Sequence, residues 1–432
     1  MNRDTQKIGL IGAISIGIGG MVGGGIFAVL GEAVSLSHGA TPVAFLVAGA
    51  VALLTAVAYA RLSVAYPSRG GTVFFIDTAF GNNLTSGSVN LMLWLSYLVT
   101  IALYAVAFSA YAQTFLSGPA SPLEKHALIS TAILLPTLIN LLSAAFVSRS
   151  ESLIVALKLL LLAVIILASL PDIDPGRLEP ARWGTPLSVI SAGMIIFVAY
   201  EGFELIANAA EEIDDPERNL PRAFLASVLI VIALYIVIAA ITVSSVPEAS
   251  LVAAKDYALA VAAEPALGRV GFVVVSVAAL LATFSAINAT IYGNARLGYT
   301  LAKEGELPET FDREVWNEPL PGVLITAAVS LLIANTIELK EIAIIGSASF
   351  LLIFALVNAA AYRLRGRIGG SGGLYLAASL LSTAALGILL LHAWEENSRA
   401  LLIFGTFILL SLLFEAFYGV WVRGHFLGRR YD

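Results

Sequence analysis

The sequence has no cysteine, few histidines and few charged residues. Without cysteine the chain forms no disulfide and no thiolate-ligated metal site, and its 4 histidines lie too far apart for metal-ligand spacing. It contains no phosphate-binding loop, nucleic-acid motif, HExxH helix, paired intramembrane aspartates or Ser/His arrangement. We therefore expect no enzyme, no bound metal, no cofactor and no nucleic-acid partner.

Apolar residues dominate instead. Charged residues make up 12% of the 432 residues and hydrophobic residues 59%, and the mean hydropathy is +0.90. Soluble proteins carry about 25% charged residues, so this composition indicates a protein embedded in a lipid bilayer. About 20 apolar residues form one membrane-spanning helix. The sequence predicts an all-α membrane protein with twelve transmembrane helices, at residues 8–36, 43–66, 84–116, 127–147, 152–170, 186–210, 222–246, 267–299, 321–336, 340–361, 374–392 and 400–422.

Two shorter segments have a different pattern. Residues 70–80 are apolar but too short to cross a bilayer, which predicts an interfacial or re-entrant helix. Residues 249–265 carry Lys255, Asp256 and Glu264 among apolar residues, which predicts an amphipathic helix over the outer face.

The distribution of positive charge predicts the orientation. Twelve spans place both termini on one side, and most lysines and arginines fall in the segments on that side. Because cytoplasmic loops of membrane proteins are enriched in Lys and Arg, we expect a multi-pass protein of the cell membrane with both termini inside. Nothing in the sequence fixes the oligomeric state.

The first span is interrupted by glycine. Residues 15–27 contain six glycines, three of them consecutive at Gly23, Gly24 and Gly25. Each costs a helix about 1 kcal/mol relative to alanine, which favours a break. Unpaired backbone groups are tolerated at membrane depth only inside protein or beside a wet cavity. The half-helix N-terminus then offers amides to an anion and the preceding C-terminus offers carbonyls to a cation, which suits a zwitterion. A close helix–helix contact through small residues is the alternative, and this stretch alone leaves both open.

The sixth span carries a second interruption at Gly202, between the carboxylates of Glu201 and Glu204. Breaks in the first and sixth spans are typical of a five-plus-five inverted repeat. We therefore predict a first repeat at 1–170, a second at 171–366, and two peripheral helices at 367–432.

Four motifs carry a resemblance to a known family. They are Gly23–Phe27 in the first span, Tyr200–Glu204 in the sixth, Asp215–Arg222 after it, and Asn288–Arg296 continuing to Pro308. In these, the chain resembles the amino acid–polyamine–organocation (APC) superfamily over its whole length, and within it the proton-coupled, broad-range amino acid transporters. The resemblance implies a LeuT-like fold in which helices 1 and 6 unwind around a central substrate site.

The resemblance also implies where the substrate binds. The amides of Gly23, Gly24 and Gly25 would hold its carboxylate. The substrate ammonium would meet backbone carbonyls near Ile18, Met21, Val198 and Glu201. Among the aromatic residues, Tyr200 adjoins the break and is the best candidate for the pocket wall. Glu204 would be a gating or proton-linked group, while Glu201 either faces the pocket, favouring a basic side chain, or faces water.

Lys158 is the only basic residue deep within a span. On the residues alone, it either extends to the inner interface or is an ammonium buried in the protein. The resemblance favours burial, at the position where sodium-coupled relatives of this fold bind Na⁺. The lysine would there contact the carbonyls of Gly19 and Val22 together with Ser285. Because burial disfavours a charged lysine, it would serve as a proton carrier.

These features predict a proton-coupled importer of amino acids that works by alternating access, with an amino acid, H⁺ and the lipid bilayer as partners. The alternatives are an amino acid or polyamine exchanger that needs no proton, and a membrane receptor that binds amino acids without transporting them.

Overall fold

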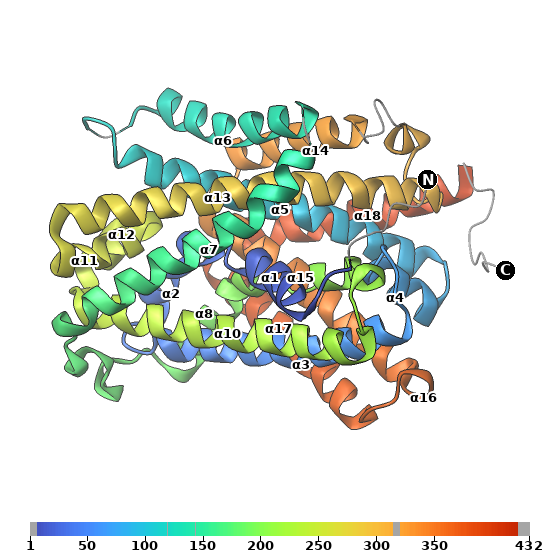
Figure 1. Cartoon of the computed structure of the whole chain (residues 1–432), viewed down its shortest axis with the longest axis horizontal. Coiled ribbons are helices and arrows are strands. Elements are labelled where there is room, and N and C mark those ends of the chain that lie inside the picture. Colours follow the sequence, from blue (N-terminus) through green and yellow to red (C-terminus); the bar gives the residue numbers. More distant parts are fainter. Residues whose placement is uncertain (1–6, 119, 143, 314–319, 422–432) are drawn as a thin grey trace.

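The computed structural model describes residues 7–118, 120–142, 144–313 and 320–421. Helices dominate this part of the chain, and most run along the long axis of the molecule (Figure 1). The long helical passes are α1 (Leu10–Met21) with α2 (Gly25–Ser37), α3 (Thr41–Ala65), α5 (Leu84–Gln113), α6 (Pro122–Leu142), α7 (Ala144–Ser169), α8 (Pro186–Ile195), α10 (Pro216–Ser245), α13 (Glu264–Lys303), α14 (Leu320–Thr336), α15 (Leu339–Arg363), α17 (Gly372–Glu396) and α18 (Ser398–Trp421).

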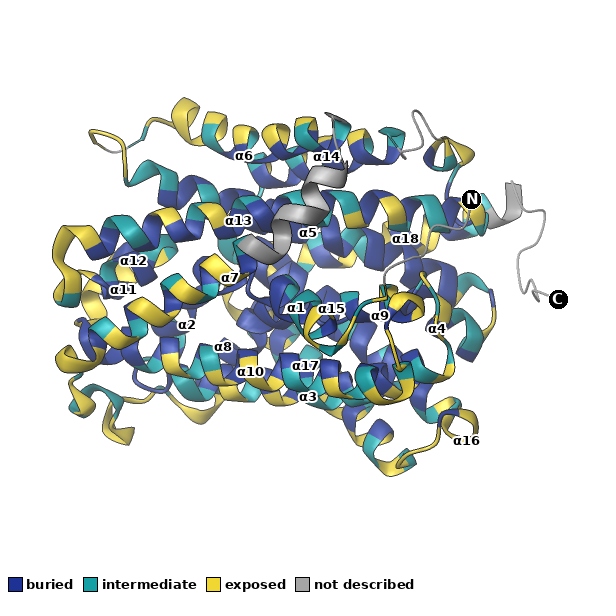
Figure 2. Ribbon diagram, viewed as in Figure 1, coloured by how far each residue is buried: buried dark blue, intermediate teal, exposed yellow. Residues whose placement is uncertain are grey.

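The prediction of an all-α membrane protein is confirmed. Among the described residues, 9 helices are long and apolar enough to cross a membrane, or 10 when the bent pair α1 and α2 counts as one span. The remaining two of the twelve predicted spans are α6 and α14. Both are helical but are not among those that meet the criterion, and α14 has only 17 residues. Buried residues fill the interior, whereas exposed residues concentrate on outward faces such as that of α6 (Figure 2).

The two short segments lie at opposite ends of the molecule (Figure 1). α4 (Thr72–Phe80) is the short helix expected at 70–80. The expectation of one helix at 249–265 is wrong. The chain instead forms α11 (Glu248–Ala254), a 3₁₀ turn (Lys255–Tyr257) and α12 (Ala258–Ala262). Lys255 has φ +40°, which a continuous helix excludes, because its backbone packs closely against Gly31 of α2.

The first span is broken at residues 22–24, where α1 and α2 meet at 49°. Neighbouring helices approach this break so closely that side chains do not fit. A Cβ on Gly25 would lie 2.7 Å from the Cα of Ala199, and one on Gly23 would lie 2.9 Å from the Cβ of Ala286. The glycines are therefore required by the packing around the break.

The sixth span is also interrupted. α8 ends at Ile195, a 3₁₀ turn covers Ile196–Tyr200, and the chain is irregular from Glu201 to Glu204 before α9 (Leu205–Asn208). Gly202 has φ +119°, a conformation that favours glycine. Both predicted discontinuities are present. The inverted repeat inferred from their spacing stays a prediction.

The two breaks touch each other. A Cβ on Gly20 would lie 2.6 Å from the carbonyl oxygen of Gly202, so the two backbones meet with no room for a side chain. Tyr235 of α10 fastens the contact, because its hydroxyl lies 2.6 Å from the Met21 carbonyl oxygen and 3.1 Å from that of Ala199. One hydroxyl thus contacts the backbone of both broken spans.

We predict that Gly202→Ala destabilises the protein. The substitution forces an L-residue to φ +119° and inserts a methyl group into the Gly20 backbone, which together should lower the free energy of unfolding by at least about 2 kcal/mol. Thermal unfolding of the purified protein measures the effect. Gly387→Ala is the matched control, since nothing lies within 4 Å of the added Cβ. Equal melting temperatures for the two variants would contradict this packing.

Candidate functional site

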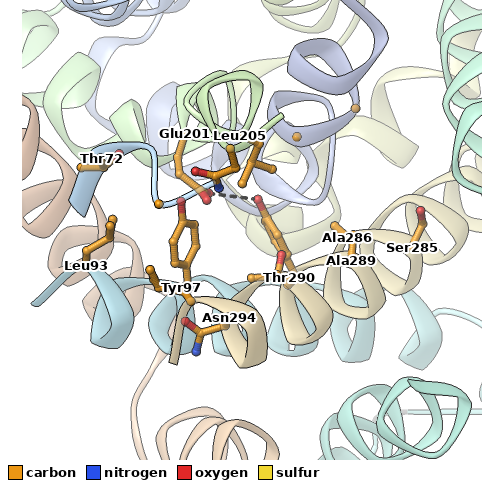
Figure 3. Close-up of a pocket in the computed structure, with 17 residues that line it drawn as sticks. Thr72, Leu93, Tyr97, Glu201, Leu205, Ser285, Ala286, Ala289, Thr290 and Asn294 are labelled. Carbon is orange, nitrogen blue, oxygen red and sulfur yellow. Dashed lines mark hydrogen bonds between the residues drawn. The ribbon is translucent and has the colours of Figure 1, made fainter. Parts of the chain in front are cut away.

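A cavity of ≈ 60 Å³ lies beside the two breaks (Figure 3). Its walls come from α1, α4, α5, α13 and the segment that ends the sixth span. The lining residues are Gly19, Gly20, Gly70, Thr72, Leu93, Tyr97, Tyr104, Glu201, Leu205, Asn208, Ser285, Ala286, Ala289, Thr290, Gly293, Asn294 and Leu297.

The cavity is elongated along one helix. Its α13 residues begin at Ser285 and end at Leu297, which at 1.5 Å per residue is about 18 Å. Gly70 and Thr72 line its far part, next to α4. The cavity therefore extends from the breaks toward the α4 end of the molecule.

The opposite end is held closed around α2. The Glu32 carboxylate is buried and lies 2.8 Å from the Lys340 ammonium and 4.0 Å from that of Lys255. The Tyr111 hydroxyl donates to the Phe27 carbonyl at 3.3 Å. Contacts from α5, α15 and the Lys255 turn thus hold α2 at this end.

Glu201 faces the cavity, and its carboxylate points toward Tyr97 (Figure 3). It is the only acidic or basic side chain among the described residues that line the cavity. The Tyr104 hydroxyl donates to this carboxylate at 3.4 Å, which is long for a hydrogen bond between oxygens. The cavity therefore carries one negative charge when Glu201 is ionised.

Glu204 lies behind the cavity wall. Its carboxylate accepts hydrogen bonds from the Gly202 amide at 2.8 Å and from the Tyr97 hydroxyl at 3.1 Å, and the residue is buried. Tyr97 itself lines the cavity. A change in the cavity can therefore reach the second break through a single tyrosine.

The predicted carboxylate site is buried and does not line the cavity. Gly23, Gly24 and Gly25 are all inaccessible. The ring of Tyr104 packs against Gly24. Amides in the first turn of α2 have no acceptor within the helix, so this backbone is suited to an anion once it is uncovered.

Three of the four predicted carbonyls already accept hydrogen bonds at the breaks. Ile18 accepts from the Val22 amide at 2.8 Å, Met21 from the Tyr235 hydroxyl, and Val198 from the Glu201 amide at 3.3 Å. A carbonyl oxygen has two lone pairs, so each has one left for a ligand. The residues of α1 that line the cavity are Gly19 and Gly20.

Lys158 is buried, with 2% of its surface exposed. α7 packs against both α13 and α1, which are the helices that carry the partners expected from the sequence. Gly19 and Ser285 line the cavity, and Val22 is buried at the break. The lysine is thus buried in the protein interior, on a helix that packs against α1, and does not extend to the interface.

Tyr200, the predicted pocket-wall residue, does not line the cavity. The Tyr200 hydroxyl donates to the Phe45 carbonyl at 2.8 Å, so its ring faces α3. Two other tyrosines were missed in the sequence analysis. Tyr104 and Tyr235 contact the breaks instead. Tyr104 follows Tyr97 by seven residues and so shares a helix face with it. That spacing could have identified Tyr104, whereas nothing in the sequence marks Tyr235.

A polar cluster lies at the α4 end. The side-chain amide of Asn90 donates to Asp77 at 3.1 Å and to Glu306 at 3.0 Å, which joins α4 and α5 to the segment after α13. Nearby, burial and the neighbouring Glu306 raise the pKa of Glu304 to about 7.

Comparison of the sequence with known proteins identifies its family. A model of the amino acid permease family matches residues 8–422. The chain is 36% identical to the inner membrane transport protein YbaT of Escherichia coli, over 95% of this chain and 96% of that protein. It is 35% identical to an uncharacterized protein, MJ0609, of Methanocaldococcus jannaschii, over 97% and 96% respectively. It is also 30% identical to the human large neutral amino acids transporter small subunit 2, over 77% of this chain and 65% of that protein.

The raised pKa of Glu304 predicts a pH dependence of stability. Between its usual pKa and about 7, the folded protein binds more protons than the unfolded chain. Stability should therefore fall as pH rises through this window and level off above it. Glu304→Gln should flatten the curve of melting temperature against pH between about 4.5 and 7. The control is Glu309→Gln, at an exposed position of the same segment. A Glu304→Gln curve parallel to the wild type would contradict the assignment.

Proposed function

Because the chain belongs to the amino acid permease family, we propose that it is a proton-coupled importer of amino acids that works by alternating access. The observation that carries this proposal is the cavity beside two broken spans, together with Lys158, which is buried on a helix that packs against α1. Glycine backbone, a carboxylate and tyrosine hydroxyls bind a small polar solute without any metal or cofactor.

The substrate binds at the breaks by its two charged ends. Its carboxylate is bound by the amides of Gly23, Gly24 and Gly25, where the N-terminus of α2 favours negative charge. Its ammonium faces the C-terminal end of α1 and Glu201, where carbonyl oxygens and a carboxylate replace its water. The cost of moving a zwitterion from water is offset at both ends.

Lys158 carries the proton. A charged lysine inside a membrane protein is expensive and is retained only where it is paired or functional. Protonated, its ammonium bridges α7 to the Gly19 and Val22 carbonyls and Ser285, which supports α1 against α13. Loss of the proton removes this support and lets α1 move relative to α13. Protonation and substrate binding thereby act on the same helix.

The packing of the helices into two groups supports alternating access. α1 packs with α10 and α10 with α3, whereas α5 and α7 pack with α13, and the cavity lies between α1 and the α5–α13 pair. The contacts around α2 and the extension of the cavity toward α4 support a state in which the cavity opens on the side of α4. Because we predict that both termini lie on the cytoplasmic side of the membrane, the α4 side is the cytoplasmic one. Glu204, bonded to both Tyr97 and Gly202, links the cavity to the second break and acts as the gate.

Proteoliposome uptake tests the proposal. A gradient of two pH units, acid outside, supplies about 2.7 kcal/mol per proton, enough to concentrate an amino acid about 100-fold. We expect the wild type to accumulate amino acids under this gradient and Lys158→Met to lose the pH response. Lys125→Met is the control, since Lys125 is exposed.

Three results would count against the proposal. Uptake that ignores the gradient but requires an internal counter-substrate indicates an exchanger. Binding without uptake indicates a receptor. An unchanged pH response in Lys158→Met removes the lysine from proton coupling.

A further inference from the structure

Tyr104 contacts both halves of the proposed substrate site. Its ring packs so closely on Gly24 that a Cβ there would overlap it, and its hydroxyl lies 3.5 Å from the corresponding point on Gly23. The same hydroxyl donates to the Glu201 carboxylate at 3.4 Å. Tyr104 lines the cavity, whereas the three glycines behind it do not. The ring therefore stands between the cavity and the start of α2.

We propose that Tyr104 covers the carboxylate-binding amides in the empty protein and that Glu201 holds it there. The substrate ammonium binds Glu201, displaces the tyrosine hydroxyl and releases the ring from Gly24. The uncovered amides of Gly23–Gly25 then bind the substrate carboxylate. This inference rests on the proposed function and narrows it to solutes that carry an ammonium and a carboxylate together.

The exchange at Glu201 favours the substrate. The Tyr104 hydrogen bond is long and its donor is neutral, whereas a bond from an ammonium to a carboxylate is charge-assisted and about twice as strong. A buried carboxylate without a cation is costly, and no lysine, arginine or histidine is among the described residues that line the cavity.

The surroundings of the ring allow it to move. The α13 residues that approach Gly24 and Gly23 are Thr283 and Ala286, and both are small. The cavity continues past Ala286 and Ala289, and so offers space next to the ring. On the other side Gly24 has no side chain to hold it. The hydroxyl bond to Glu201 is thus the specific polar contact that keeps the ring over the amides.

The arrangement defines a substrate class. A carboxylate without an ammonium meets a covered site, and an amine without a carboxylate pairs with Glu201 but leaves the amides empty. An acidic side chain brings a second negative charge near Glu201. The site therefore takes α-amino acids with neutral or basic side chains.

Equilibrium binding to the purified protein tests this inference. The ligands are L-alanine and L-leucine, with propionate and 4-methylpentanoate as matched analogues that lack the ammonium group. We expect Glu201→Gln to weaken amino acid binding at least about 10-fold, through loss of a buried charge pair. Tyr104→Phe removes only the competing hydroxyl, so it should strengthen binding about 2- to 10-fold in the wild-type background. It should have no effect in the Glu201→Gln background. Tyr104→Ala should allow the two carboxylates to bind.

Two control variants separate this effect from general damage. Tyr375 of α17 lies outside the cavity, and Tyr375→Phe removes the hydroxyl that donates to the Gly369 carbonyl. Glu341→Gln neutralises a buried carboxylate paired with Arg399. Both should bind amino acids as the wild type does. Tyr104→Phe keeps the ring, so it remains informative if Tyr104→Ala fails to fold.

The outcomes distinguish this inference from the proposed function. It is overturned alone if the wild type transports amino acids but Tyr104→Phe leaves their affinity unchanged or weaker, or if Glu201→Gln binds them normally. Wild-type binding of propionate as tight as that of L-alanine also overturns it. A wild type that neither binds nor transports any amino acid overturns the proposed function.

Discussion

The contact between Gly20 and Gly202 is the constraint on which the rest of the structure depends. Two membrane spans meet there backbone to backbone, and a side chain at either glycine would overlap the backbone of the other span. Regular helices would bury their backbone groups in their own hydrogen bonds. Because these spans break where they meet, amides and carbonyls gather in one place in the protein interior. Tyr235 fastens the two breaks from α10, and the cavity opens beside them.

Much of this could be predicted from the sequence, because membrane helices are specified locally. Apolar run length gave the helical passes, and consecutive glycines marked the break at residues 22–24, since glycine is costly in a helix without a reason to be there. Gly202 between two carboxylates marked the second break for the same reason. Lys158 was notable as a charge in an apolar span, and its burial agrees with a role inside the protein.

Contacts between distant segments could not be predicted. Tyr235 looks like an ordinary tyrosine of an apolar span, and only the fold brings it onto Met21. Its spacing from Tyr97 marks the helix face of Tyr104, but only the fold shows that the ring packs on Gly24. Tyr200 adjoins the break in sequence, yet its backbone turn directs it to α3. Residues 249–265 were expected to form one helix, but the Lys255 backbone forms a tight turn that packs against Gly31. In each case a partner more than 30 residues away decides the outcome.

The central claim is that the cavity beside the breaks holds the substrate and opens to one side at a time. The absence of native cysteine allows a direct measurement, namely labelling of a single Thr290→Cys by a membrane-impermeant thiol reagent applied from either side of oriented vesicles. The account predicts labelling from the cytoplasmic side in the empty protein and protection by a saturating amino acid mixture. Equal labelling from both sides, or labelling that amino acids leave unchanged, would contradict it.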